Sequence, residues 1–340
     1  MAEEVFPGAE WKRAEPEEAG FGAAKLADAK RWLDDSSGGA PYRVVIARGG
    51  RLVAEWYRGV ERDDRQGLAS AAKSVFSCLL GIAIAEGRIE SADARLADYY
   101  PEALDVPEGR GPKEGRYAFP KDHAITFRQL ISNTSGYMKP GEAPGKVFHY
   151  QTYGMNVLTH AVAKAYGLYD VNDPQGSPGL KQLVDDKLRR PMQAKWTYYV
   201  GNFDLQPEAK ISVFGYYDGI AATALDMARL GQLWLHLGRW NDKQLVPEGW
   251  LRAATRTAPN ILENCPAEQW GYGYGFWTND YGRLWPHLPR DSFAASGAGG
   301  QHMWVCPSLD LVVVQSPGVY EDQEDNDGGL LRLVVAAAAY

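Results

Sequence analysis

The strongest constraint on the fold is the separation of strand-forming runs into two groups near opposite ends of the chain. The first group, residues 42–58 (YRVVIARGGRLVAEWYR), is two β-rich runs around Gly49-Gly50, a dipeptide suited to a tight turn with positive φ. The second group consists of short aromatic or β-branched runs at 271–277, 292–296, 302–306 and 311–315. The simplest packing pairs the hairpin with the late runs in one antiparallel sheet.

Helix-forming segments fill the interval between the two groups. Residues 70–86 place Val75, Leu79 and Ile82 at helical spacing, and Gly87 follows as a stop. Further helices are expected near 126–132, 152–166, 179–190, from Thr223 to Gly238, and over 327–340. We therefore predict an α+β fold with two parts: residues 1–68 plus 265–340 form an antiparallel sheet flanked by helices, and residues 69–264 form an inserted, mainly helical domain.

The net charge and the cysteine content limit the classes of ligand that the protein is expected to bind. The 340 residues carry a net charge of −7, which disfavours nucleic acid and anionic lipid as ligands. The three cysteines, Cys78, Cys265 and Cys306, are too widely spaced for a zinc knuckle or a disulfide framework. We expect no metal and no cofactor, a small-molecule substrate, and a monomer or homodimer.

Targeting signals are not evident in the sequence. The acidic first residues do not resemble a signal peptide, and no apolar run reaches the roughly 18 residues that span a bilayer. We therefore expect no membrane association and a cytoplasmic protein, unless an export signal has been removed.

A serine and a lysine stand three residues apart at the start of the apolar helix, at Ser70 and Lys73. This spacing places both on one helical face, where a lysine made neutral by burial can take the hydroxyl proton. The alternative is a serine that caps the helix and a solvated lysine. Two observations favour the catalytic interpretation: no other serine of the chain has a lysine three residues on, and Lys73 is followed by the apolar Val75 and Phe76.

Other nucleophile systems have less support. The sequence has no Gly-x-Ser-x-Gly elbow, so an α/β-hydrolase is disfavoured. The six histidines form no His-x-x-x-His pair, which disfavours a zinc protease site. The glycine-rich stretches GYGYGF and SGAGG fit neither the dinucleotide-binding pattern nor a P-loop.

Further motifs join the Ser70–Lys73 helix in a fixed order: LISNTSGY at 130–137, FHYQTYGMNVL at 148–158, and FAASGAGGQHMWVCPSLDLVVV at 293–314. Together they resemble the serine β-lactamase and penicillin-binding protein superfamily. The resemblance is closest to the branch of class C β-lactamases, D-alanyl-D-alanine carboxypeptidases, family VIII esterases and 6-aminohexanoate-dimer hydrolases. It implies a helical domain packed against an antiparallel sheet flanked by helices.

By this resemblance, Ser70 is the acylated nucleophile and Lys73 is its partner. Tyr150 matches the tyrosine of the family's Tyr-x-Asn element, where it would relay the proton to the leaving group and then activate water. Thr152 takes the place of the asparagine and would contact substrate. Tyr153 competes with Tyr150, since Tyr153-Gly-Met-Asn156 also offers both residue types, but the position of Phe148 favours Tyr150.

The family's third element, a strand beside the serine, falls at Ala295-Ser296-Gly297. Gly297 would let substrate approach the strand closely, Ser296 would contact it, and the backbone N–H groups of Ser70 and Ala298 would form an oxyanion hole. The usual cation at position 295 is absent. Since that cation helps to hold a substrate carboxylate in the superfamily, its absence favours a less anionic ester or amide.

Four side chains in or beside the motifs are candidates for the pocket wall: Tyr137, Tyr217, Trp277 and His302. Each is equally explained by core packing. The function predicted is a serine hydrolase that cleaves an ester or an amide through an acyl-enzyme on Ser70. The alternatives are a β-lactamase or D-alanyl-D-alanine carboxypeptidase and, in another class, a non-catalytic penicillin-binding or sensor protein.

Overall fold

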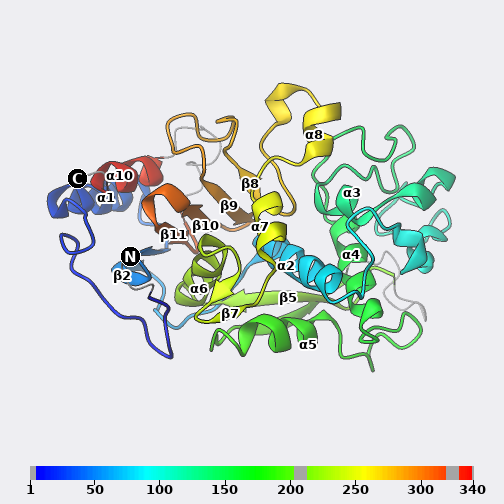
Figure 1. Ribbon diagram of the computed structural model, residues 1–340, viewed down its shortest axis with the longest axis horizontal. Coiled ribbons are helices and arrows are strands. Elements are labelled where there is room, and N and C mark those ends of the chain that lie inside the picture. The colour runs from blue at the N-terminus through cyan, green and yellow to red at the C-terminus, as the bar shows by residue number, and fades with distance from the viewer. Residues whose placement is uncertain (1–4, 203–212, 319–328, 339–340) are drawn as a thin grey trace.

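The computed structural model describes residues 5–202, 213–318 and 329–338 (Figure 1). Its centre is a six-stranded sheet in which neighbouring strands all pair antiparallel. The strand order is β2 (Arg51–Arg58), β1 (Tyr42–Arg48), β11 (Leu311–Gln315), β10 (Gln301–Cys306), β9 (Phe293–Gly297) and β8 (Trp277–Thr278). The hairpin and the late strands therefore share one sheet, as predicted. Gly49 and Gly50 form its first turn with φ of 57° and 69°.

Helices cover both faces of this sheet. α1 (Ala23–Ser36) and α10 (Gly329–Ala338) lie side by side on one face, at the end of the molecule that carries both termini (Figure 1). α6 (Ala224–Leu235) packs on the other face against β1, β10 and β11, although the predicted domain division placed its residues in the helical domain. Thr223 caps α6, since its hydroxyl accepts a hydrogen bond from the Asp226 N–H at 3.1 Å.

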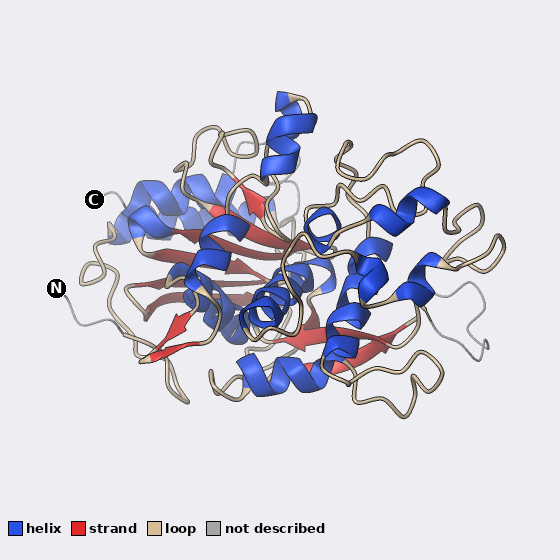
Figure 2. Cartoon of the chain, turned by 45° about the vertical axis from the view of Figure 1, so that its right-hand side comes forward, coloured by secondary structure: helices blue, strands red, loops and turns tan. Residues whose placement is uncertain are grey.

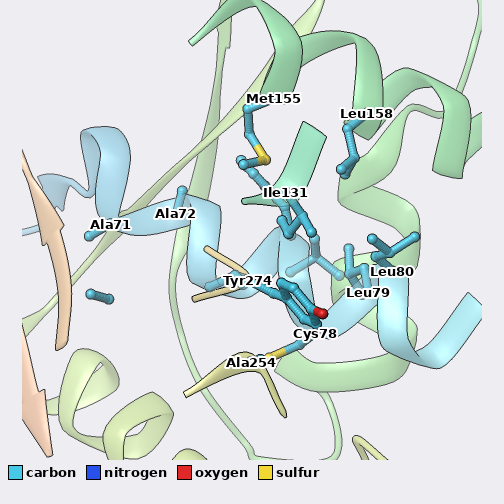
Figure 3. Packing of buried hydrophobic residues seen from close by; sticks show 14 of the residues in the cluster. Ala71, Ala72, Cys78, Leu79, Leu80, Ile131, Met155, Leu158, Ala254 and Tyr274 are labelled. Carbon is cyan, nitrogen blue, oxygen red and sulfur yellow. The ribbon is translucent and has the colours of Figure 1, made fainter. Parts of the chain in front are cut away.

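α2 (Ala72–Ala85) runs through the middle of the molecule and is buried over most of its length. It is preceded by a single 3₁₀ turn, Ala69–Ala71, and ends before Gly87, which has a φ of 68°. α4 (Tyr153–Ala165), α5 (Leu180–Val184) and α7 (Glu248–Ala254) pack against it, and α3 (Phe127–Ile131) packs on α4. Figure 3 shows Leu79 and Leu80 of α2 beside Ile131 and Leu158 in this core.

The region between the two groups of main-sheet strands also contains a second sheet that the sequence did not suggest (Figure 2). Its order is β3 (Gln66–Gly67), β5 (Tyr217–Ala222) and β4 (Thr197–Gly201). The remaining regular elements are β6 (Arg239–Trp240), β7 (Lys243–Gln244), α8 (Pro259–Asn264), a π-helical turn at Asp185–Arg189, and 3₁₀ turns at Leu96–Asp98, Pro101–Leu104, Pro120–Ala124, Ala267–Gln269 and Pro307–Leu309.

The expected strand over 271–277 is wrong for most of its length, because only Trp277–Thr278 pairs regularly. The glycines of this segment instead let the backbone pass close to α2. A Cβ added at Gly275 would lie 2.9 Å from the carbonyl oxygen of Lys73, and Ser74 Oγ donates to the Gly275 carbonyl at 2.6 Å. Local contact with the helix thus takes the place of strand pairing.

The expected closing helix is present as α10, and residues 327, 328, 339 and 340 of that expectation lie outside the described residues. Within the described part of the chain, every helix is too short or too polar to cross a bilayer.

Candidate active site

Ser70 and Lys73 form a hydrogen-bonded pair at the start of α2. Ser70 lies in the 3₁₀ turn and is partly exposed, whereas Lys73 lies one turn further on and is 2% exposed. Lys73 Nζ donates to Ser70 Oγ at 2.7 Å. The spacing of three residues thus brings a buried amine to a hydroxyl that solvent can reach.

Burial favours the neutral form of the Lys73 amine. It lowers the pKa of the ammonium group to about 8, because an ion in a poorly solvated position is disfavoured relative to the neutral amine. The neutral amine is therefore accessible near neutral pH. A neutral amine at 2.7 Å can accept the Ser70 proton.

Tyr150 lies against the same lysine. Lys73 Nζ is 4.8 Å from the centroid of its ring, within the range of a cation–π contact. The ring stacks on Trp277 at 5.4 Å and meets Tyr272 edge-on at 5.7 Å. Tyr150 precedes α4, whereas the competing candidate Tyr153 is the first residue of that helix. The ring contact with Lys73 favours Tyr150, and the choice between the two stays a prediction.

The end of β9 meets the backbone that carries Ser70. A Cβ added at Gly297 would lie 2.1 Å from the Leu68 carbonyl oxygen and 3.0 Å from the Ser70 nitrogen. The close approach of the chain itself therefore requires a residue without a Cβ at this position, and an approach of substrate to Gly297 stays a prediction. Ala298 is exposed in the turn that follows. The oxyanion hole of Ser70 and Ala298 N–H groups stays a prediction.

The alternation of β9 and β10 corrects two of the expected substrate contacts. Ala295 and Met303 belong to the core shared with α2, whereas Ala294 and Trp304 belong to the core under α1 and α10. Ser296 and His302 pair across the strands and share this second face. The ring of His302 is buried against Trp285, 6.0 Å away, on the side of the sheet opposite Ser70.

Tyr137 is a further correction. Its side chain is completely buried, and its hydroxyl donates to the Ala103 carbonyl in the core. Thr152 is partly exposed just before α4, and its carbonyl accepts from the Asn156 N–H at 2.9 Å. A substrate contact of Thr152 stays a prediction.

Tyr217 and Trp277 do lie in the neighbourhood of the pair. Trp277 stacks on Tyr150 and is partly exposed. Tyr217 meets Phe76 of α2 edge-on at 5.7 Å. Burial raises the pKa of the Tyr217 phenol, and the neighbouring phenols of Tyr199 and Tyr150 act in the same direction.

Tyr199 was not recognised in the sequence. Its ring lies on the bare backbone of Gly219, its cross-strand partner, where an added Cβ would be 2.2 Å from the ring. Its hydroxyl lies close to the backbone of Ala69, the residue before Ser70, and the side chain remains 43% exposed. The β-rich run WTYYV at 196–200 was the available signal.

The described residues contain no group of three or more His, Cys, Asp or Glu side chains that could hold a metal ion. The groups gathered around Ser70 are a hydroxyl, an amine, phenols and backbone N–H groups. This set is suited to acyl transfer.

Comparison with known proteins agrees with this geometry. Residues 31–334 match the Beta-lactamase family. The chain belongs to the beta-lactamase family. It is also similar to the 6-aminohexanoate-dimer hydrolase of Paenarthrobacter ureafaciens, with 27% identity over 315 residues that cover 86% of this chain and 76% of the relative. The prediction of a hydrolase related to the β-lactamases is confirmed.

Solved structures share the fold. A Bacillus anthracis protein provisionally assigned as a 6-aminohexanoate-dimer hydrolase has a TM-score of 0.66 at 20% identity, covering 98% of this chain and 89% of its own. Unliganded simvastatin synthase of Aspergillus terreus has a TM-score of 0.66 at 15% identity, covering 94% and 99%. A penicillin-binding protein homologue of Caulobacter crescentus has a TM-score of 0.64 at 16% identity, covering 94% and 98%. The predicted β-lactamase/transpeptidase-like fold is confirmed.

Proposed function

We propose that this β-lactamase-family protein hydrolyses a linear amide or an ester through an acyl-enzyme on Ser70. The observation that carries the proposal is the 2.7 Å hydrogen bond between Ser70 Oγ and a lysine whose pKa burial lowers to about 8. A lysine that serves only as a solvated surface charge has no reason to be buried beside a serine.

Acylation begins when neutral Lys73 takes the hydroxyl proton as Ser70 Oγ attacks the substrate carbonyl carbon. The negative charge that develops on the carbonyl oxygen is stabilised by the N–H groups of Ser70 and Ala298. The tetrahedral intermediate collapses when the bond to the leaving group breaks, and Tyr150 gives its proton to the departing nitrogen or oxygen. The proton on Lys73 then restores the Tyr150 phenol, so that the charges balance.

Deacylation uses the same groups in reverse order. A water molecule attacks the acyl carbonyl and gives its proton to the base formed by Lys73 and Tyr150. The bond to Ser70 Oγ breaks, and the hydroxyl recovers its proton as the acid product leaves.

The substrate class follows from the charges and rings around the pair. The curated relative is named for hydrolysis of an amide-linked dimer. Position 295, where the superfamily carries a cation for a substrate carboxylate, is a buried alanine here. The partly exposed ring of Trp277 supplies aromatic surface beside Tyr150, and such surface suits uncharged acyl or aryl groups. These features favour an amide or ester over a β-lactam.

The test is covalent labelling followed by turnover. A fluorophosphonate should add to Ser70 with loss of fluoride, visible by intact mass and peptide mapping, and S70A should not be labelled. The wild type should hydrolyse p-nitrophenyl esters of two to eight carbons or the linear 6-aminohexanoate dimer, with nitrocefin as the β-lactam comparison. Labelling at another residue, or an S70A variant that keeps wild-type turnover, contradicts the proposal. Efficient nitrocefin turnover with neither of the other substrates cleaved favours the β-lactamase alternative.

A further inference from the structure

One residue far from Tyr150 in the sequence is bonded to both of its neighbours. The His149 N–H donates to the Asn133 carbonyl at 2.9 Å, and the Gln151 N–H donates to the Asn133 side-chain Oδ1 at 3.0 Å. The two bonds bracket Tyr150 from either side. They fix the backbone of this irregular segment, which has no strand partner of its own.

Asn133 is itself held in place by burial and by a backbone hydrogen bond. It is 2% exposed just after α3, and its own N–H donates to the Leu130 carbonyl at 3.1 Å. Its φ of 56° lies in the left-handed region, which asparagine tolerates better than most residues. This conformation lets one residue offer both its carbonyl and its side-chain oxygen to the chain at 149–151.

The ring contacts of Tyr150 do not replace these bonds. Trp277 stacks on the ring and Tyr272 meets its edge, and such contacts allow the ring to slide within its plane. Hydrogen bonds to the two flanking N–H groups are directional and set where the side chain leaves the backbone. A third bond, from Gln151 Nε2 to Ser135 Oγ at 3.3 Å, ties the same two segments together.

We propose that Asn133 is a positioning residue that holds the Tyr150 phenol in register with Lys73 and Ser70. This inference rests on the proposed function, because it gives Tyr150 a proton-transfer role. Misplacement of a catalytic group by about 1 Å costs roughly a hundredfold in rate. Loss of the Asn133 side chain should therefore lower kcat far more than it changes KM.

The experiment compares N133G and N133A with a control at the opposite end of α3. Both variants remove the Oδ1 acceptor, but glycine accepts a positive φ and alanine resists it. T126A removes the N-cap of α3 without touching residues 149–151. We expect N133G and N133A to lower kcat for one p-nitrophenyl ester roughly 30- to 100-fold with KM within about threefold, and T126A to stay within about threefold of wild type. N133D keeps an acceptor oxygen and should recover activity to within about tenfold of wild type.

A double variant of N133G with Y150F separates a role of Asn133 in positioning Tyr150 from a general disturbance of the fold. If Asn133 acts through Tyr150, the N133G change should cost less than about threefold in a Y150F background, because the group it positions is already gone. Effects that multiply in the double variant, or an N133G enzyme within twofold of wild type, overturn the inference. Should N133G fail to fold, the order N133D above N133A tests the same point, and equal loss in these two overturns it.

The two proposals fail in different ways. A wild-type protein without turnover, or turnover that S70A retains, contradicts the proposed function and this inference together. Turnover that requires Ser70 and Tyr150 but not the Asn133 acceptor contradicts this inference alone.

Discussion

The Nζ atom of Lys73 lies 4.8 Å from the centre of the Tyr150 ring while it donates a hydrogen bond to Ser70. One buried nitrogen thus contacts both the proposed nucleophile and the proposed proton relay. Burial pulls its pKa down, and a π-face favours its charged form. This balance suits a group that must hold and release a proton near neutral pH.

The pH dependence of turnover follows from the pKa of Lys73. We expect kcat/KM to rise with pH and to level off above an apparent pKa near 8, since only the neutral amine can accept the Ser70 proton. K73A should lose activity about as severely as S70A, because the two act as a unit. A pH–rate series from 5.5 to 9.5 with a p-nitrophenyl ester checks this, after correction for spontaneous hydrolysis. A profile that falls across this range would mean that charged Lys73 is the active form.

The identity of the proton relay is tested by two conservative changes. Y150F removes only the hydroxyl of the ring that lies against Lys73, and should lower kcat by roughly 10²- to 10⁴-fold, the usual contribution of a general acid–base. Y153F changes the first residue of α4 and should stay within about tenfold of wild type. Steady-state kinetics on one ester, with thermal melts of both variants, compares them. A larger loss of kcat in Y153F than in Y150F would mean that Tyr153 is the proton relay and that the motif begins three residues later.

Gly297 provides a test of how the strand meets the nucleophile. An alanine Cβ would lie 2.1 Å from the Leu68 carbonyl, so the 3₁₀ turn that carries Ser70 must move. We expect G297A to destabilise the fold by about 1–3 kcal/mol, as overpacking does, and to lower kcat at least tenfold. G249A is the matched control, because its Cβ meets nothing within 4 Å and its position lies within α7. Urea unfolding and ester kinetics of both variants test this. Equal stability and equal kcat in G297A and G249A would show that the 3₁₀ turn moves aside at little cost.

Tyr199 is expected to contact the substrate rather than the reacting atoms. Its exposed ring lies beside Ala69, and an aromatic contact of about 0.5–1.5 kcal/mol corresponds to a roughly 2- to 12-fold change in binding. Y199A should therefore raise KM for aryl esters by that factor and leave kcat nearly unchanged. V200A, at the next and more exposed position of β4, serves as the control. An equal response of acetate and benzoate esters to Y199A would argue against an aromatic contact.

The residues that the sequence identified correctly are those whose signal is local. The Gly49-Gly50 turn, the helix start at Thr223 and the Ser70–Lys73 spacing each depend on a few neighbouring residues. α1 was not assigned, although Leu26, Ala29 and Leu33 form a buried stripe at helical spacing.

Features that depend on distant pairing were missed or misplaced. β5 reads YDGIAA, whose Asp and Gly are poor strand formers, and it exists because β3 and β4 pair with it. His302 was placed on the wrong face because a motif gives the order of strand residues but not the side to which each points. Asn133 lies within the LISNTSGY motif but had no role assigned from the sequence, and Tyr199 lies outside the motifs. Their contacts in the fold single them out.

The misplaced histidine leads to the last prediction, which concerns stability in acid. Burial lowers the pKa of His302 to about 4, and within the described structure neither ring nitrogen has a hydrogen-bond partner. In the unfolded chain the same group titrates near 6.5. Above pH 6.5 both states are neutral and the histidine has no pH-dependent effect. Between pH 6.5 and 4 the unfolded chain binds a proton that the folded protein refuses, so stability falls as the pH falls.

The size of this effect makes it measurable. The difference between the two pKa values lowers the free energy of unfolding by about 2 kcal/mol at pH 5 and by about 3 kcal/mol below pH 4. H302L removes the titrating group and keeps an apolar side chain against Trp285, so its free energy of unfolding relative to wild type should improve by about 2 kcal/mol between pH 7.5 and pH 5. Urea titrations of both proteins at the two pH values measure the difference.

His160 also has a pKa lowered by burial to about 4, but its Nε2 bonds to the Gly215 carbonyl at 2.9 Å. H160L should therefore lose stability at pH 7.5, where H302L does not. A stability difference between H302L and wild type that is the same at both pH values would mean that His302 finds a partner or solvent on protonation.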